Sequence, residues 1–340
     1  MAKNWKIKKH WRVKEAEKKT ENEKMEERRE EILARGRKFK YPIQYSKHKL
    51  VINTLIITIL AAVLMVGIGW LALFKLQNTS DLLYRLTKVL PIAVAEVDGE
   101  KVRYSDYLLI YRSSIVPIEQ QASQLGEKKD IEAMRKHYKK AALEDAEEFT
   151  YALKLGKELG VEVTKQEVDQ ALEDQRKAGG VKRSLDSFKK ILKDNFGLSE
   201  KEYRRLVYLS LLKKEVAKKI DKKATEITKT AEEEIQKEAG DLKKVSEKLG
   251  KKVMYLTTGG MVSQMNIDGG RASAATKLKK GEVGKSFVSA NGDSYFIVKL
   301  LDKNKTEVSY ESLQIPMTEF ETRMKKIQAS GKIKEYIAKE

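Results

Sequence analysis

An uncharged apolar run from Leu50 to Phe74 divides this chain into a short N-terminal part and a long C-terminal part. As a helix rising about 1.5 Å per residue, the run would be roughly 37 Å long, enough to cross a hydrocarbon core about 30 Å thick with some tilt. A buried helix of a soluble protein is the alternative, but such a helix normally has one polar face, and this run has none. The sequence therefore predicts a transmembrane helix over residues 50–74.

The distribution of basic residues predicts the orientation of this helix. More lysines and arginines lie close before the run than close after it, and cytoplasmic flanks carry such an excess. The lead of residues 1–49 is too long for a cleaved secretory signal. We therefore expect a single-pass protein of the cell membrane, in which residues 1–49 form a cytoplasmic basic arm, residues 75–91 a linker, and the remainder an extracytoplasmic domain.

The composition excludes certain stabilising bonds and certain classes of binding partner. The chain has no cysteine, which excludes a disulfide framework and a lipid-modified cysteine at the anchor. Its net charge of +19 does not favour nucleic acid, because the basic positions are mixed with acidic ones and lack interleaved aromatic residues. Attraction to an anionic membrane or wall surface is the expected consequence.

Local patterns after the linker predict a small hairpin and then a series of helices. Residues 93–97 and 101–104 alternate around Asp98-Gly99, a short-hairpin signal. A helix should follow from Asp106 to about Gln124, which Pro117 should kink or break. Capping boxes, in which a hydroxyl precedes a carboxylate by three residues, mark helix starts at Thr164 and Ser199. Apolar periodicity places the helices near residues 131–158, 165–177, 185–195 and 200–221.

Three stretches of this region resemble a known family. Residues 93–107 (AVAEVDGEKVRYSDY), 143–176 and 184–219 are similar, in order and type of element, to the N-terminal chaperone module of the SurA, PrsA and PpiD group. The resemblance implies a hairpin and several helices that cradle unfolded secreted proteins. It also implies that a parvulin-type peptidyl-prolyl isomerase domain follows. We accordingly expect a helical chaperone module over residues 92–222.

Residues 223–308 resemble that parvulin domain in a degenerate form. A helix over residues 231–250, a glycine-rich segment over 259–270, and a turn and strand over 278–303 carry the likeness. The first strand expected before the helix, with its histidine, is not evident. The family's second histidine would lie on the final strand, which here reads Tyr295-Phe296-Ile297. We therefore expect no catalytic residue.

The C-terminal part is expected to complete the chaperone module. The resemblance implies that the chain returns to this module after the isomerase domain, so residues 309–340 are assigned to it. We expect residues 311–316 to pair with the 93–104 hairpin. A further capping box, Thr318 with Glu321, should open a helix over about residues 319–338 that packs on the 131–158 or the 200–221 helix.

The fold class predicted is mainly α with a small α+β inserted domain, in which a single-pass membrane anchor precedes a SurA N-terminal-like helical chaperone module. The predicted function is that of an ATP-independent foldase or holdase, anchored in the membrane, that binds unfolded secreted or membrane proteins and uses no cofactor and no metal. Expected partners are unfolded secreted polypeptides, membrane lipid through residues 50–74, and the translocon, but not nucleic acid. Two alternatives remain open, a single-pass scaffold that docks one folded partner and an active parvulin-type isomerase.

Candidate client contacts are aromatic, aliphatic and methionine side chains, because aromatic and adaptable methionine surfaces suit promiscuous recognition. We expect them to line an apolar cradle between the helices and the insert, although the same pattern is also typical of ordinary core residues. These candidates are Tyr107, Leu108, Tyr111, Ile115 and Tyr208 in the helical module, and Met261, Met265, Phe287 and Phe296 in the insert.

Overall fold

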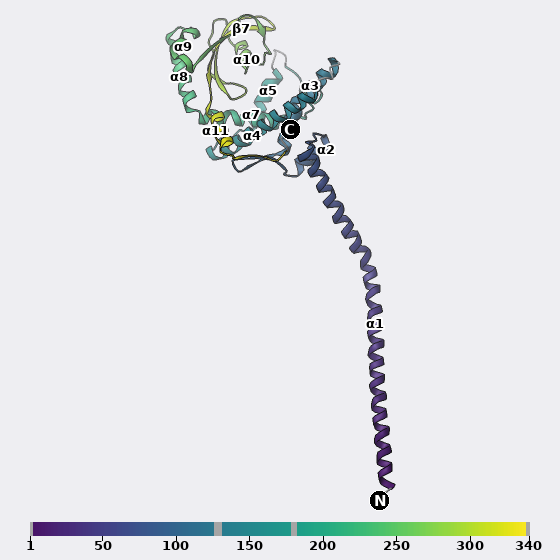
Figure 1. Ribbon diagram of the computed structural model, residues 1–340. Helices are drawn as coiled ribbons and strands as arrows, with labels where there is room; N and C mark the ends of the chain where they lie inside the picture. Colours follow the sequence, from purple (N-terminus) through teal and green to yellow (C-terminus); the bar gives the residue numbers. More distant parts are fainter. Residues whose placement is uncertain (1–2, 126–130, 178–181, 338–340) are drawn as a thin grey trace. The chain divides into compact units, whose positions relative to one another are not determined.

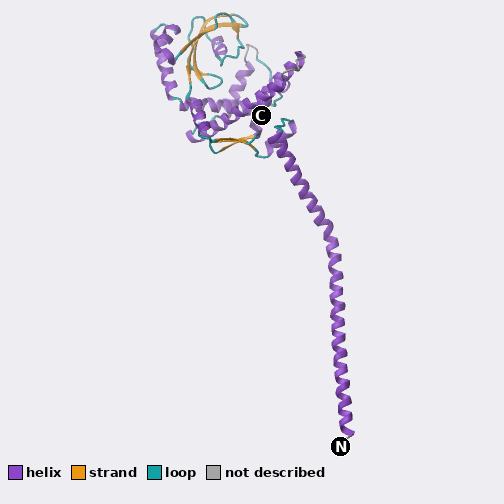
Figure 2. Cartoon of the chain, viewed as in Figure 1, coloured by secondary structure: helices purple, strands orange, loops and turns teal. Residues whose placement is uncertain are grey.

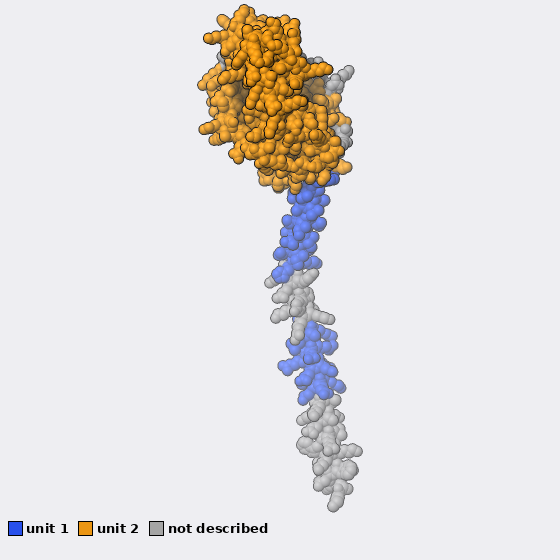
Figure 3. Space-filling view, turned by 90° about the vertical axis from the view of Figure 1, so that its left-hand side faces the viewer, with its two compact units in different colours: residues 1–71 blue, residues 72–340 orange. Residues whose placement is uncertain are grey.

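The chain divides into two compact units, residues 1–71 and residues 72–340 (Figure 3). The computed structural model describes the backbone of residues 3–125, 131–177 and 182–337, and the side chains of 21–36, 48–124, 131–177 and 182–337. The first unit is one helix, α1 (Lys3–Trp70), and the short π-helical segment Leu71–Lys75 continues it into the second unit (Figure 1). The stretch His48–Lys75 is long and apolar enough to span a membrane.

The predicted helices of the second unit are present, with ends within a few residues of those expected. They are α3 (Tyr104–Leu125), α4 (Ile131–Leu159), α5 (Lys165–Lys177), α6 (Leu185–Phe196) and α7 (Glu200–Ile220). The expected break at Pro117 is wrong, because α3 continues through it. Packing of α3 against α4 and α6 outweighs the one backbone hydrogen bond that a proline removes.

A small sheet of three strands contains the predicted hairpin. Strand β1 (Ala93–Val97) pairs with β2 (Glu100–Arg103) on one side and with β8 (Ile333–Glu335) on the other. The expectation that residues 311–316 would pair with the hairpin is wrong. The predicted helix over 319–338 is also too long, because α11 spans Glu319–Ala329 and a left-handed Gly331 (φ +69°) then turns the chain into β8.

A larger sheet follows the helices. Its strands are β3 (Met254–Thr257), β5 (Phe287–Val288), β6 (Ser294–Lys303) and β7 (Glu307–Pro316) in the order β3-β7-β6-β5, with β4 (Val262–Ser263) also paired to β7. Residues 311–316 are therefore central to this sheet. The one helix expected over 231–250 is two, α8 (Lys222–Lys237) and α9 (Leu242–Leu249), because Ala239 and Gly240 both take positive φ.

Helices cover both faces of the larger sheet. On one face, Ile297, Leu313 and Ile315 join a hydrophobic core that continues through α8 and α9 into α3, α4 and α7. On the other face, Phe296 and Tyr310 belong to a separate core with the short helix α10 (Arg271–Thr276). Figure 2 shows α4, α7 and α11 between the small and the larger sheet.

A single buried carboxylate joins three helices where the helical region meets the larger sheet. Asp221 is the only residue between α7 and α8. Its Oδ1 accepts the backbone N–H of Ala224 at 2.9 Å, and its Oδ2 accepts those of Thr318 and Glu319 at 2.8 and 3.1 Å. The expected capping box of Thr318 and Glu321 does not form, because this distant carboxylate caps α11 instead.

Replacement of Asp221 should destabilise the second unit strongly. The substitution Asp221→Ala leaves three N–H groups at two helix starts without an acceptor, and we expect a loss of roughly 2–4 kcal/mol in the free energy of unfolding. Asp241→Ala is the matched control, because Asp241 caps only α9, through the N–H of Lys244, and its loss should cost clearly less. Urea unfolding of the full-length protein in detergent measures both. Equal losses in the two variants would contradict the assigned role of Asp221.

Candidate functional site

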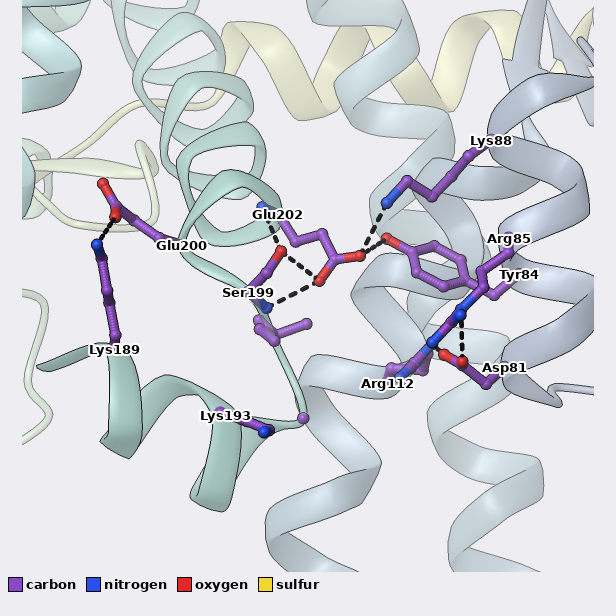
Figure 4. Close-up of a pocket in the computed structure, with 12 residues that line it drawn as sticks. Asp81, Tyr84, Arg85, Lys88, Arg112, Lys189, Lys193, Ser199, Glu200 and Glu202 are labelled. Atoms are coloured by element: carbon purple, nitrogen blue, oxygen red, sulfur yellow. Dashed lines mark hydrogen bonds and ion pairs between the residues drawn. The ribbon is translucent and has the colours of Figure 1, made fainter. Parts of the chain in front are cut away.

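An open cleft of about 640 Å³ lies beside a helix that the sequence did not predict. This helix, α2 (Asp81–Val89), occupies the segment expected to be a linker, and the other walls of the cleft come from α3, α6 and the start of α7 (Figure 4). Five basic and three acidic side chains line it: Arg85, Lys88, Arg112, Lys189, Lys193, Asp81, Glu200 and Glu202. The cleft therefore carries a basic excess.

Glu202 connects α2 to the start of α7. Its Oε1 accepts from the hydroxyl of Tyr84 at 2.8 Å and from the ammonium of Lys88 at 3.0 Å. Its Oε2 accepts from the backbone N–H and the hydroxyl of Ser199, which completes the predicted capping box. Burial by itself would raise the pKa of Glu202, but the hydrogen bonds from Ser199, Tyr84 and Lys88 outweigh it and lower the pKa to about 2.

A second set of contacts holds the start of α2. Arg112 of α3 pairs with Asp81 at 2.7 Å, and its guanidinium lies 4.7 Å from the centre of the Tyr84 ring. Burial and the hydrogen bond to Glu202 raise the pKa of Tyr84, so its hydroxyl stays protonated and donates. These contacts fix α2 on the body of the second unit. The described lining residues are held in ion pairs and helix caps.

Four of the five candidate client contacts in the helical module lie in the hydrophobic core. Tyr107, Leu108, Tyr111 and Ile115 are buried on α3 against the rest of the helical region. They are part of what holds α3 on α4, so no client can reach them in this structure. Tyr208 of α7 is half-buried, and the guanidinium of Arg205 lies 5.7 Å from its ring centre.

The two phenylalanines of the larger sheet pack against each other. Phe287 is half-buried, and Phe296 is only 5% exposed. Their ring centres are 5.9 Å apart, and the guanidinium of Arg271 lies 5.0 Å from the ring of Phe296. A Cβ added to Gly269 would come within 2.9 Å of that ring, so the packing there has no spare room. The structure places Phe296 in the core beside α10 rather than on an open apolar cleft.

Exposed apolar side chains gather on the segment from β3 to α10. Met261 and Met265 are exposed, as a client contact requires, and the structure adds Met254 and the fully exposed Ile267, which the sequence analysis did not select. Pairing of β4 with β7 holds the backbone of this segment. In the sequence, this segment is marked by apolar residues that stand among turn residues. The sequence does not show which of these apolar side chains face solvent.

Comparison with known families identifies the helical region. A family model described as the SurA-like N-terminal domain matches residues 43–217, more than half of the 340 residues. A comparison with curated proteins gave no match. The matched range begins before the apolar stretch His48–Lys75 and ends within α7, so it includes α2 and three walls of the cleft.

The low pKa of Glu202 predicts a pH-dependent contribution to stability. Because folding lowers this pKa from 4.5 to about 2, the stabilisation is complete above about pH 4.5 and is lost as the pH falls through about 2. Glu202→Gln should therefore lower the free energy of unfolding by roughly 1–3 kcal/mol at pH 7, and the deficit should shrink toward zero in acid. Thermal unfolding of the full-length protein in detergent, repeated across this pH range, measures the deficit.

Glu167→Gln is the matched control, because Glu167 forms the same capping box with Thr164 but is fully exposed. Its deficit should be smaller. A pH-independent deficit in Glu202→Gln would show that the carboxylate contributes by packing and not by its charge.

Proposed function

This chain belongs to the SurA-like N-terminal domain family, and we propose that it is a membrane-anchored extracytoplasmic chaperone that binds unfolded secreted polypeptides without ATP. The observation that carries the proposal is the match over residues 43–217, because a chaperone-like role is consistent with that family. The same range includes the helix that could span a membrane. The matched range therefore covers both the proposed anchor and the helical region.

Membrane anchoring is supported by the stretch His48–Lys75, which is long and mostly apolar and whose residues 50–68 are exposed. In water such a surface is unfavourable, whereas in a bilayer it is matched by lipid tails. The excess of lysine and arginine before the stretch supports a cytoplasmic N-terminus and an extracytoplasmic second unit. The proposed location is therefore the cell membrane, with a single pass.

The proposed client surface is the exposed apolar segment between β3 and α10. Its side chains Met261, Met265 and Ile267 are exposed while the neighbouring backbone is held in the sheet. Flexible methionine side chains adapt to many apolar sequences. Binding would be broad and weak for its area, because an unfolded client loses entropy when it is ordered.

The resemblance of the larger sheet to a degenerate parvulin domain supports binding rather than isomerisation. Phe296 stands at the strand position where the resemblance implies a histidine, and its cross-strand neighbour on β7 is Gln314. Neither side chain titrates near neutral pH. Phe296 is also enclosed by Gly269 and Arg271, which supports a structural role for its ring.

The client surface can be tested by an aggregation assay. Full-length protein in nanodiscs should suppress aggregation of an unfolded, proline-containing client at equimolar amounts. Combined replacement of Met261, Met265 and Ile267 by serine should raise the concentration needed for half suppression about tenfold, because three apolar contacts are lost. The control replaces Met134 and Leu159, two exposed apolar residues of α4, by serine and should suppress normally.

Each outcome assigns a different function. Loss of suppression in both variants would move the client surface away from this segment, and no suppression by the unmodified protein would overturn the chaperone proposal. One folded partner at fixed stoichiometry would then assign a scaffold. Acceleration of prolyl isomerisation, followed in the same sample, would assign an isomerase.

A further inference from the structure

Helix α2 exposes most of its aliphatic side chains. Leu83, Tyr84 and Thr87 are buried against the rest of the second unit. On the other side Leu82 and Val89 are 77% and 81% exposed, and Leu86 and the C-cap residue Leu90 are exposed as well. At 100° per residue, Leu82, Leu86 and Val89 lie within about 60° of one another and form one stripe, the outer face of α2. A surface helix normally presents polar residues there.

The outer face of α2 is held facing outward. Tyr84 donates to Glu202 on one side of the cleft, and Asp81 accepts from Arg112 on another. These two contacts, together with burial of Leu83, leave α2 no freedom to turn its outer face inward. The exposed stripe is therefore a fixed feature of the second unit and needs an occupant.

Basic side chains flank the outer face. Arg85 lies three residues after Leu82 and four before Val89, which places it at the edge of the stripe, and its side chain is largely exposed. Its ion pair with Asp81 is exposed and therefore weak. Lys88 lies further round the helix beyond Arg85, where its ammonium donates to Glu202 in the cleft. An apolar stripe beside cations is the pattern of helices that lie at a membrane surface.

Chain connectivity brings a lipid surface within reach. Lys75 ends the stretch that is apolar enough to span a membrane, and only residues 76–80 separate it from Asp81. This link can extend at most about 20 Å. A span ending at Lys75 therefore keeps α2 close to the headgroups, where interfacial helices sit about 5–10 Å deep. No comparable covalent link places a client or a second copy of the protein next to α2.

We propose that the outer face of α2 lies in the interface of the membrane that holds the span, with Arg85 directed to anionic phospholipid headgroups. The proposal rests on the membrane anchoring given under the proposed function. Because α2 is fixed to the second unit, this contact sets how that unit is oriented on the membrane, and it places the basic cleft beside the lipid headgroups. It is separate from the client surface between β3 and α10.

Single cysteines test the contact, because the chain has none of its own. Full-length Leu82→Cys and Val89→Cys, each labelled with an environment-sensitive fluorophore, are reconstituted in phosphatidylcholine vesicles with and without phosphatidylglycerol. A lipid-borne quencher placed near the headgroups reports contact with the interface. Val63→Cys in the apolar stretch is the control for anchoring, and Leu159→Cys, exposed on α4, is the control for an aqueous site.

We expect blue-shifted emission and lipid quenching at positions 82 and 89, stronger with phosphatidylglycerol, and neither effect at position 159. Adding Arg85→Gln should remove most of the dependence on phosphatidylglycerol. If position 63 responds to a deep quencher while 82 and 89 behave like 159, the α2 proposal is wrong and the anchoring stands. If position 63 does not respond, the anchoring is wrong. A blue shift at 82 and 89 without lipid quenching would show that protein covers the stripe instead.

Discussion

The buried carboxylate of Asp221 is the contact through which the two halves of residues 72–340 become one unit. It lies between α7 and α8 and uses both oxygens, one to start α8 and the other to start α11, almost a hundred residues later in the chain. Both helix starts gain negative charge where the peptide dipoles favour it. The hydrophobic core then continues from the helices across one face of the larger sheet. Docking of α11 on α7 and addition of β8 to the hairpin follow from where this capping contact places the end of the chain.

Local signals predicted the helices well, whereas contacts between distant segments were out of reach. Periodicity and the capping boxes at Thr164 and Ser199 gave α4 to α7 nearly residue by residue, because those signals depend on neighbours within one turn. The same reasoning misplaced residues 311–316 and the cap of α11. The alternation of a strand does not show which other strand it pairs with. A Thr-Glu capping pair does not form where a buried carboxylate from a distant segment already accepts the N–H groups at the helix start.

The candidate site was predicted in part for a related reason. The sequence marks methionine and aromatic residues as candidates, but only burial separates Tyr107, which is enclosed, from Met265, which is exposed. The larger omission was helix α2, which lies in the segment predicted to be a linker. Leu82, Leu83, Leu86 and Val89 fall on one face of a helix, so the sequence carried an amphipathic signal there that was not used. Only the tertiary contacts of Tyr84 and Asp81 decide which side is inside.

A short helix such as α2 could hold to a bilayer only under the conditions that this chain supplies. Nine residues are too few for a stable isolated helix in water, but packing against α3 and the contact with Glu202 fix the backbone in advance. Under the proposed anchoring, the span already confines α2 near the headgroups. Insertion of its three apolar side chains therefore occurs at a high effective concentration of lipid and does not have to offset the translational and rotational entropy of association. The weak partition of one stripe is then sufficient. Such a contact is also reversible.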